Sequence, residues 1–113
     1  MIITKESLMA NGACYYERAH FERLFGEGGK VTLKRLLRAT KAELPLSWAV
    51  YNLMTPEQTR IWEKWSQKVW DGYYRAVNRR KNPMSYNEAE EARYVGLAYA
   101  FAIALLRTGE DVP

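Results

Sequence analysis

Apolar and polar positions recur with helical spacing between positions 55 and 81, and this stretch predicts the longest helix of the chain. Thr55 precedes Pro56, whose fixed φ suits the first helical turn, and Gln58 lies where the partner of a capping box belongs. The residue before Pro83 is disfavoured in a helix, which predicts an end there. We therefore expect one long central helix over about 56–81.

At about 100° per residue, this helix presents three surfaces. The predicted core stripe consists of Ile61, Trp65, Val69, Gly72 and Ala76, with Trp62 and Tyr73 at its edge. A basic ridge on another side consists of Lys64, Lys68, Arg75 and Arg79. Trp70 and Tyr74 fall outside the core stripe, so they either pack under the N-terminal helices or remain exposed as anchors for a partner.

Four shorter helices are expected before the central one, over about 5–10, 13–25, 33–41 and 46–54. Thr4 and Thr32 are suitable N-caps for the first and third of them, and Gly12 is a suitable stop. The residues of the second helix that have core spacing are Cys14, Phe21, Leu24 and Phe25. The glycine-rich stretch 26–30 is expected to be a solvated connector. No run alternates with a period of two residues, so no sheet is predicted.

The last helix is predicted over about 86–108, where Ser85 and Glu88 have the spacing of a capping box. Its small residues recur every fourth position and allow a close approach of the central helix: Ala92, Gly96, Ala100 and Ala104. Residues 94–106 are apolar nearly all round the helix, yet this run is too short to span a membrane. Such a helix must be covered on several sides, either by the other helices or by a second subunit.

These elements predict a single all-α domain over residues 1–113, built as a bundle of about six helices. A module of short helices over 1–54 is expected to wrap against a long helical hairpin over 55–113. In that hairpin, the last helix packs antiparallel to the central helix.

The composition of the chain excludes several kinds of binding site and catalytic site. The chain has 113 residues, a net charge of +4 and a pI near 9.3, but residues 83–113 hold five acidic and two basic side chains. The molecule is therefore a charge dipole rather than a uniformly basic coat for nucleic acid. One cysteine and one histidine cannot form a disulfide or the usual zinc site, and six residues apart on one helix Cys14 and His20 are poorly aligned for catalysis. We expect no metal, no cofactor and no enzymatic activity, in a reducing cytoplasm.

The first half of the chain resembles the N-terminal module of small uncharacterised proteins encoded by tailed phages and prophages. The residues that carry this resemblance are Ile3-Thr4, Asn11-Gly12-Ala13-Cys14, Phe21, Leu24-Phe25-Gly26, Val31-Thr32, Trp48 and Asn52-Leu53. The resemblance implies a phage or prophage accessory protein in the cytoplasm of an infected or lysogenic bacterium. Accessory proteins of that kind often bind and inhibit a host protein, including components of host defence.

We expect the chain to act by binding another protein, because aromatic side chains beside arginine are the residue types that dominate protein interfaces. The predicted binding residues are Lys64, Lys68, Trp70, Tyr74, Arg75 and Arg79. An alternative is non-specific nucleic-acid binding through Lys34, Arg38, Lys41, Arg79, Arg80 and Lys81. A second alternative is an oligomeric assembly protein built through the last helix. A helix-turn-helix motif is disfavoured because the segment 46–53 has no side chain suited to base edges.

Overall fold

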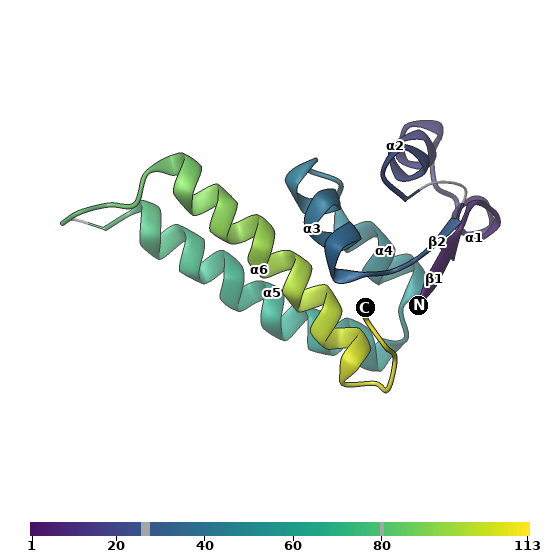
Figure 1. Ribbon diagram of the computed structural model, residues 1–113. Helices are drawn as coiled ribbons and strands as arrows, with labels where there is room; N and C mark the ends of the chain where they lie inside the picture. Colours follow the sequence, from purple (N-terminus) through teal and green to yellow (C-terminus); the bar gives the residue numbers. More distant parts are fainter. Residues whose placement is uncertain (26–27, 80) are drawn as a thin grey trace.

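The computed structural model describes residues 1–25, 28–79 and 81–113 of the chain (Figure 1). In chain order, its elements are β1 (Ile2–Thr4), α1 (Lys5–Ala10), α2 (Tyr15–Phe25), β2 (Gly28–Lys30), α3 (Leu33–Lys41), α4 (Leu46–Leu53), α5 (Pro56–Val77) and α6 (Tyr86–Leu106). The prediction of an all-α bundle of about six helices is confirmed within these described ranges. The molecule is elongated, with extents of 49 × 28 × 24 Å.

The hairpin of α5 and α6 forms the long axis of the molecule, as predicted (Figure 1). The two helices run antiparallel and make the most extensive helix–helix contact, while α3 packs against another side of α6. The turn between α5 and α6 lies at one end of the molecule, far from β1, β2, α1 and α2. The end of the hairpin that carries this turn therefore extends beyond the N-terminal elements (Figure 1).

The start of α5 agrees with the prediction and its end does not. Thr55 and Gln58 form the capping box, and Pro56 occupies the first turn. The helix ends at Val77, four residues before the predicted end. The returning chain explains the difference, because the Met84 amide donates a hydrogen bond of 3.1 Å to the carbonyl of Ala76. A contact from beyond the turn thus satisfies a carbonyl that another helical turn would have used.

The buried side of α5 is rotated by about 60° from the predicted core stripe, at 100° per residue. Its buried residues are Gln58, Trp62 and Ser66. Trp62 packs edge-on against Phe101 of α6, with ring centroids 6.2 Å apart. Ile61 and Trp65, which belong to the predicted stripe, are only partly buried. The prediction followed hydrophobicity alone and so missed two polar residues that face the interior.

The prediction of no sheet is wrong. Strands β1 and β2 form a two-stranded antiparallel sheet in which Ile3 lies opposite Gly29. The glycine-rich stretch, expected to be a connector, therefore supplies a strand at Gly28–Lys30. Strands of three residues are too short to show an alternating pattern, and Gly29 offers no side chain to reveal one.

The second helix begins at Tyr15 rather than at position 13, and Cys14 is exposed instead of belonging to the core. Phe21 is buried as expected. The side chains of Leu24 and Phe25, which were also expected in the core, lie outside what the structure describes. The hydrophobic core in this region therefore includes Phe21, Ile3 of β1 and residues of α1 and α3.

The remaining caps and helices follow the prediction closely. Thr4 caps α1, Thr32 caps α3, and the exposed side of α3 carries Lys34, Arg38 and Lys41. Gly12 adopts a φ of 78°, the left-handed conformation that glycine adopts without strain. In α6, the small-residue row meets α5 at Gly96, whereas Ala92 of the same row is exposed. Phe101 and Leu105 of the same helix are fully buried.

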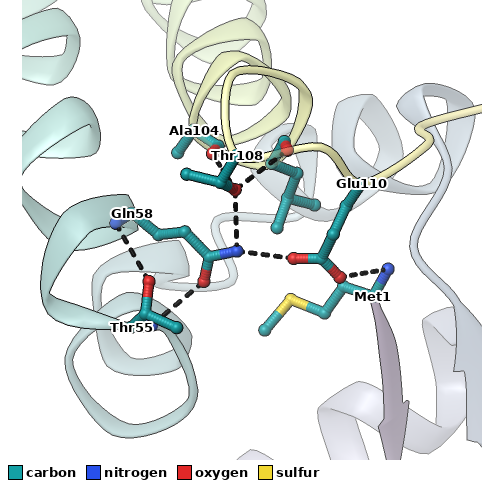
Figure 2. Close-up of polar contacts among 7 residues, drawn as sticks. Met1, Thr55, Gln58, Ala104, Thr108 and Glu110 are labelled. Atoms are coloured by element: carbon teal, nitrogen blue, oxygen red, sulfur yellow. Dashed lines mark hydrogen bonds and ion pairs between the residues drawn. The ribbon is translucent and has the colours of Figure 1, made fainter.

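A polar network ties the base of the hairpin to the start of the chain (Figure 2). The Gln58 side chain donates hydrogen bonds of 3.0 Å to the Thr108 hydroxyl and 2.5 Å to the carboxylate of Glu110. The other carboxylate oxygen of Glu110 lies 3.0 Å from the amino group of Met1. The Thr108 hydroxyl donates in turn to the carbonyl of Ala104. The buried amide of Gln58 is therefore satisfied by residues 50 and 52 positions away in the sequence.

Candidate protein-binding surfaces

The four predicted cations of α5 form an exposed basic flank, defined here as Lys64, Lys68, Arg75 and Arg79. Two of them lie over the half-buried ring of Trp65, with the Nζ atoms of Lys64 and Lys68 at 5.7 and 4.6 Å from its centroid. The guanidinium carbon of Arg107, from the end of α6, lies 5.2 Å from the same centroid. Three cations thus converge on one indole, whose negative π face attracts them.

None of these three cations has a carboxylate within 4 Å among the residues that the structure describes. No ion pair joins Asp71 to Lys68 or Arg75, although their spacings of three and four residues on one helix would allow it. Asp71 accepts a hydrogen bond of 3.0 Å from the side chain of Gln67, and the Arg75 side chain donates to the backbone carbonyl of Asp71. The positive charge of this flank therefore remains available to an external acidic group.

Trp70 and Tyr74 belong to a different surface, an aromatic cluster formed by Trp70, Tyr73, Tyr74 and Tyr86. The rings of Trp70 and Tyr74 are stacked, with centroids 5.9 Å apart and planes at 29°. Tyr73 meets both of them edge-on and also meets Tyr86 from the start of α6. Tyr74 and Tyr86 are 54% and 63% exposed, so a rigid group of packed rings faces solvent.

Arg93 of α6 organises the inner side of the aromatic cluster. Its guanidinium carbon lies 4.7 Å from the ring centroid of Trp70 and 5.1 Å from that of Tyr73. A contact of 3.7 Å joins it to the carboxylate of Glu90, and its Nε atom is buried without a hydrogen-bond partner in the structure. The cation is thus held mainly by aromatic faces, which fixes the orientation of the rings.

A groove of about 300 Å³ begins at Trp70 and Arg93 and runs toward the turn between α3 and α4. At its rim, the hydroxyl of Tyr94 donates a hydrogen bond of 2.8 Å to the carboxylate of Glu43. This hydrogen bond raises the pKa of the Tyr94 hydroxyl above its ordinary value of 10.0. Glu43 has a φ of 60°, a conformation in which glycine would be favoured. The groove is therefore bordered by a hydrogen bond that joins α6 to the turn between α3 and α4.

Tyr86 of the aromatic cluster has a hydroxyl whose pKa is raised. Hydrogen bonding to and charge interaction with the neighbouring Tyr73 hydroxyl, followed by the charge of Glu90, raise the pKa of Tyr86 to about 12 from 10.0. These interactions favour the neutral phenol. Tyr86 therefore presents a hydroxyl group, rather than a phenolate charge, throughout the physiological pH range.

The six predicted binding residues thus fall on two surfaces. The aromatic cluster holds Trp70 and Tyr74, and the basic flank holds the four cations. At 100° per residue, Tyr74 and Lys68 are about 120° apart around α5, so one flat partner surface contacts them together only by wrapping around the helix. Arg75 follows Tyr74 directly and is the cation of the flank best placed beside the cluster.

The residues of the nucleic-acid alternative are likewise divided. One group, on the exposed side of α3, consists of Lys34, Arg38 and Lys41. Helix α3 packs on a different side of α6 from the side that contacts α5. Arg79 and Lys81 are exposed at the distal turn of the hairpin, and Arg80 lies outside the described residues. A continuous path for a phosphate backbone would have to join two separate groups of cations.

Several residues of these surfaces were not predicted from the sequence. Arg93 and Tyr86 belong to the aromatic cluster, Glu43 and Tyr94 border the groove, and Arg107 joins the cations over Trp65. Arg93 had a usable signal, because it is the one cation within the predicted last helix ahead of its final turn. A lone cation in such a helix indicates a specific partner for it.

Over the ranges that the structure describes, no group of three or more histidine, cysteine, aspartate or glutamate residues is arranged to hold a metal ion. Within the same ranges, no helix has the length and apolar character needed to cross a membrane. Comparison with protein-family models found no match, and comparisons with curated proteins and with solved structures found no significant similarity.

Proposed function

We propose that this protein is non-enzymatic and acts by binding another protein through the aromatic cluster and the adjoining Arg75. The observation that carries the proposal is the stack of Trp70 and Tyr74, held in place by Tyr73 and Arg93, with more than half of Tyr74 exposed to solvent. Tryptophan, tyrosine and arginine are the residues most enriched at binding hot spots.

The packing of the cluster lowers the conformational entropy that binding would otherwise remove. Tyr74 contacts two neighbouring rings, so its side chain is already restricted before a partner arrives. Restricting an exposed side chain on binding typically costs about 0.5–1.5 kcal/mol, and a preorganised ring avoids part of that. The groove of about 300 Å³ beside Trp70 offers a recess for an apolar side chain of the partner. A partner with an acidic residue near an apolar anchor would complement Arg75 and this groove.

The resemblance of the first half of the chain to a phage module favours a protein of the bacterial host as the partner. Inhibition or redirection of a host factor, such as a component of host defence, is the function that such binding would serve. This role requires no catalytic group on the chain, only a rigid surface of the right shape and charge.

The test is capture of partners from a host lysate, followed by affinity measurement with the purified partner. We expect the wild-type chain to retain one protein in stoichiometric amount, and the double variant Tyr74→Ala/Arg75→Glu to bind it at least thirtyfold more weakly, as expected for loss of a hot spot of about 2 kcal/mol. Tyr16→Ala is the matched control, because Tyr16 is also exposed but lies on α2. A partner retained equally by the double variant, or no stoichiometric partner at all, would contradict the proposal.

A further inference from the structure

Over residues 94–106, helix α6 is apolar on nearly every side, and the rest of the chain covers only part of it. α5 packs on one side of α6 and α3 on another. The side left open carries Val95, Tyr99 and Leu106, which are 42%, 47% and 54% exposed. Their spacings of four and seven residues keep them on one stripe of the helix. A helix with an apolar stripe facing water indicates a missing neighbour.

The two ends of this stripe carry opposite charges. Glu88 and Glu91 are exposed at the start of α6, and Glu88 lies seven residues before Val95 on the same stripe. Beside the other end, where α6 borders α5, are Arg107 and the two lysines that share the ring of Trp65 with it. We name this surface the open face of α6: Glu88, Glu91, Val95, Tyr99, Leu106 and Arg107, with Lys64 and Lys68 of α5.

We propose that a second copy of this chain covers the open face, with the two α6 helices packed antiparallel about a twofold axis between Val95 and Tyr99. The midpoint of Glu88 and Arg107 falls between Val95 and Tyr99, so this axis brings the acidic end of each copy beside the basic end of the other. At about 1.5 Å per residue, the charged ends are about 28 Å apart along the helix. A twofold interface requires this kind of self-complementarity.

In this arrangement, Glu88 and Glu91 of each copy meet Arg107, Lys64 and Lys68 of the other copy. The three cations, which lack a carboxylate among the described residues of their own chain, each gain acidic neighbours. Val95 of one copy faces Tyr99 of the other at the centre. A groove of about 320 Å³ between α5 and α6, lined by Gly72, Ala92 and Gly96 among others, lies opposite Tyr99 and Leu106 of the second copy and can receive them. The product is a four-helix arrangement of two hairpins.

The self-association and the proposed function use different exposed side chains. The groove between α5 and α6 is also lined by Tyr73 and Arg93, which support the aromatic cluster from within, but not by Tyr74. A monomeric variant with an intact cluster would keep its affinity for a protein partner. Conversely, loss of Tyr74 would leave the dimer in place. The two proposals can therefore fail separately.

The first experiment is sedimentation equilibrium over a wide range of concentrations. We expect a dimer of the 13.2 kDa chain, and we expect Tyr99→Arg to raise its dissociation constant at least thirtyfold, as for a central aromatic hot spot. Tyr16→Arg on α2 is the control and should leave the dimer intact. A wild-type chain that stays monomeric at its highest soluble concentration overturns the proposal and leaves the open face to a different protein. A dimer that Tyr99→Arg does not weaken also overturns it.

The second experiment reverses charges, and it remains decisive if one variant is less stable. The variant Glu88→Lys/Glu91→Lys has basic side chains at both ends of the open face. The variant Lys64→Glu/Lys68→Glu has acidic side chains at both ends. Because like charges would then meet across the interface, each variant should be monomeric alone. Mixing the two variants pairs opposite charges at both ends and should restore a heterodimer. Circular dichroism checks that each variant is folded. A folded pair that stays monomeric on mixing would rule out the antiparallel register.

Discussion

A Cβ atom placed on Gly96 would lie 2.9 Å from both methyl carbons of Val69. This is closer than any ordinary carbon contact, so Gly96 allows α6 to approach α5 at this point. Val69 is branched at Cβ and has one strongly preferred rotamer in a helix, so its methyl groups cannot easily turn aside. The close approach of the two helices, predicted from the row of small residues, therefore depends on this one pair.

We predict that Gly96→Ala destabilises the protein by about 1–2 kcal/mol, because overpacking of that kind costs about 1–3 kcal/mol and the gain in helix propensity offsets up to about 1 kcal/mol of it. Urea denaturation followed by circular dichroism measures the change. Gly72→Ala is the matched control in α5, where nothing lies within 4 Å of the added carbon. That substitution should stabilise the protein by about 0.5–1 kcal/mol through helix propensity alone. Equal effects of the two substitutions would mean that the helices are not in close contact at Gly96.

The buried amide of Gln58 should contribute more than an ordinary capping residue. Gln58→Ala removes the reciprocal bond to the Thr55 amide and both bonds to the C-terminal segment (Figure 2). Since a net hydrogen bond contributes about 0.5–1.5 kcal/mol and more when one partner is charged, we expect a loss of about 2–3 kcal/mol. The measurement is again the free energy of unfolding in urea.

Glu57→Ala is the control for this prediction, because Glu57 lies in the same first turn of α5 but is exposed. It should cost less than about 1 kcal/mol, the contribution of a favourable charge near a helix start. Glu110→Gln should have an intermediate effect, since it keeps an acceptor for Gln58 and removes the charge opposite the Met1 amino group. A Gln58 effect no larger than that of Glu57 would show that the network adds nothing to the cap.

The local features of this fold could be predicted from the sequence, and the long-range features could not. The caps at Thr4, Thr32 and Thr55 depend on residues three positions away, so a short window contains all the information. The end of α5 depends on a hydrogen bond from Met84 across the turn, and the burial of Gln58 depends on residues about 50 positions later. No local pattern marks either contact.

The candidate surfaces illustrate the same limit. Exposure of the four cations on α5 followed from helical spacing, which also placed Trp70 and Tyr74 outside the core stripe. The role of Arg93 and Tyr86 depends on how α6 packs beside α5, and spacing within one helix does not contain that information. The sheet was missed because β1 and β2 are separated by two helices and each has only three residues.

Ionisation of Tyr86 should lower the free energy of unfolding of the protein as pH rises from 10 to 12. Its folded pKa of about 12 lies above the ordinary value of 10.0, so the folded state binds the phenolic proton more tightly than the unfolded chain does. The resulting stabilisation is complete below pH 10 and is lost as pH rises toward 12. We predict that Tyr86→Phe reduces the slope of unfolding free energy against pH in this window. Tyr16→Phe, at another exposed tyrosine, is the control, and equal slopes for the two variants would contradict the assignment.

The hydrogen bond between Glu43 and Tyr94 should offset a backbone conformation that is unfavourable for glutamate. Glu43 follows the end of α3 with a φ of 60°, and its amide and that of Leu44 donate to the carbonyls of Thr40 and Ala39. This pattern ends a helix most favourably with glycine, and a residue with a side chain costs about 1 kcal/mol there. The carboxylate of Glu43 recovers part of that by accepting the Tyr94 hydroxyl at 2.8 Å.

A double-mutant cycle separates these two contributions. In a Tyr94→Phe background, where the hydroxyl is absent, Glu43→Gly should stabilise the protein by about 1 kcal/mol through backbone relief. In the wild-type background the same substitution also removes the hydrogen bond from Tyr94. The change in unfolding free energy should therefore be less favourable there, and we expect a difference between the two backgrounds of about 0.5–1.5 kcal/mol, the net contribution of one exposed hydrogen bond. Urea denaturation of the four proteins gives the coupling free energy. A coupling of zero would mean that the hydrogen bond does not form in solution, and the groove would then lose its fixed rim.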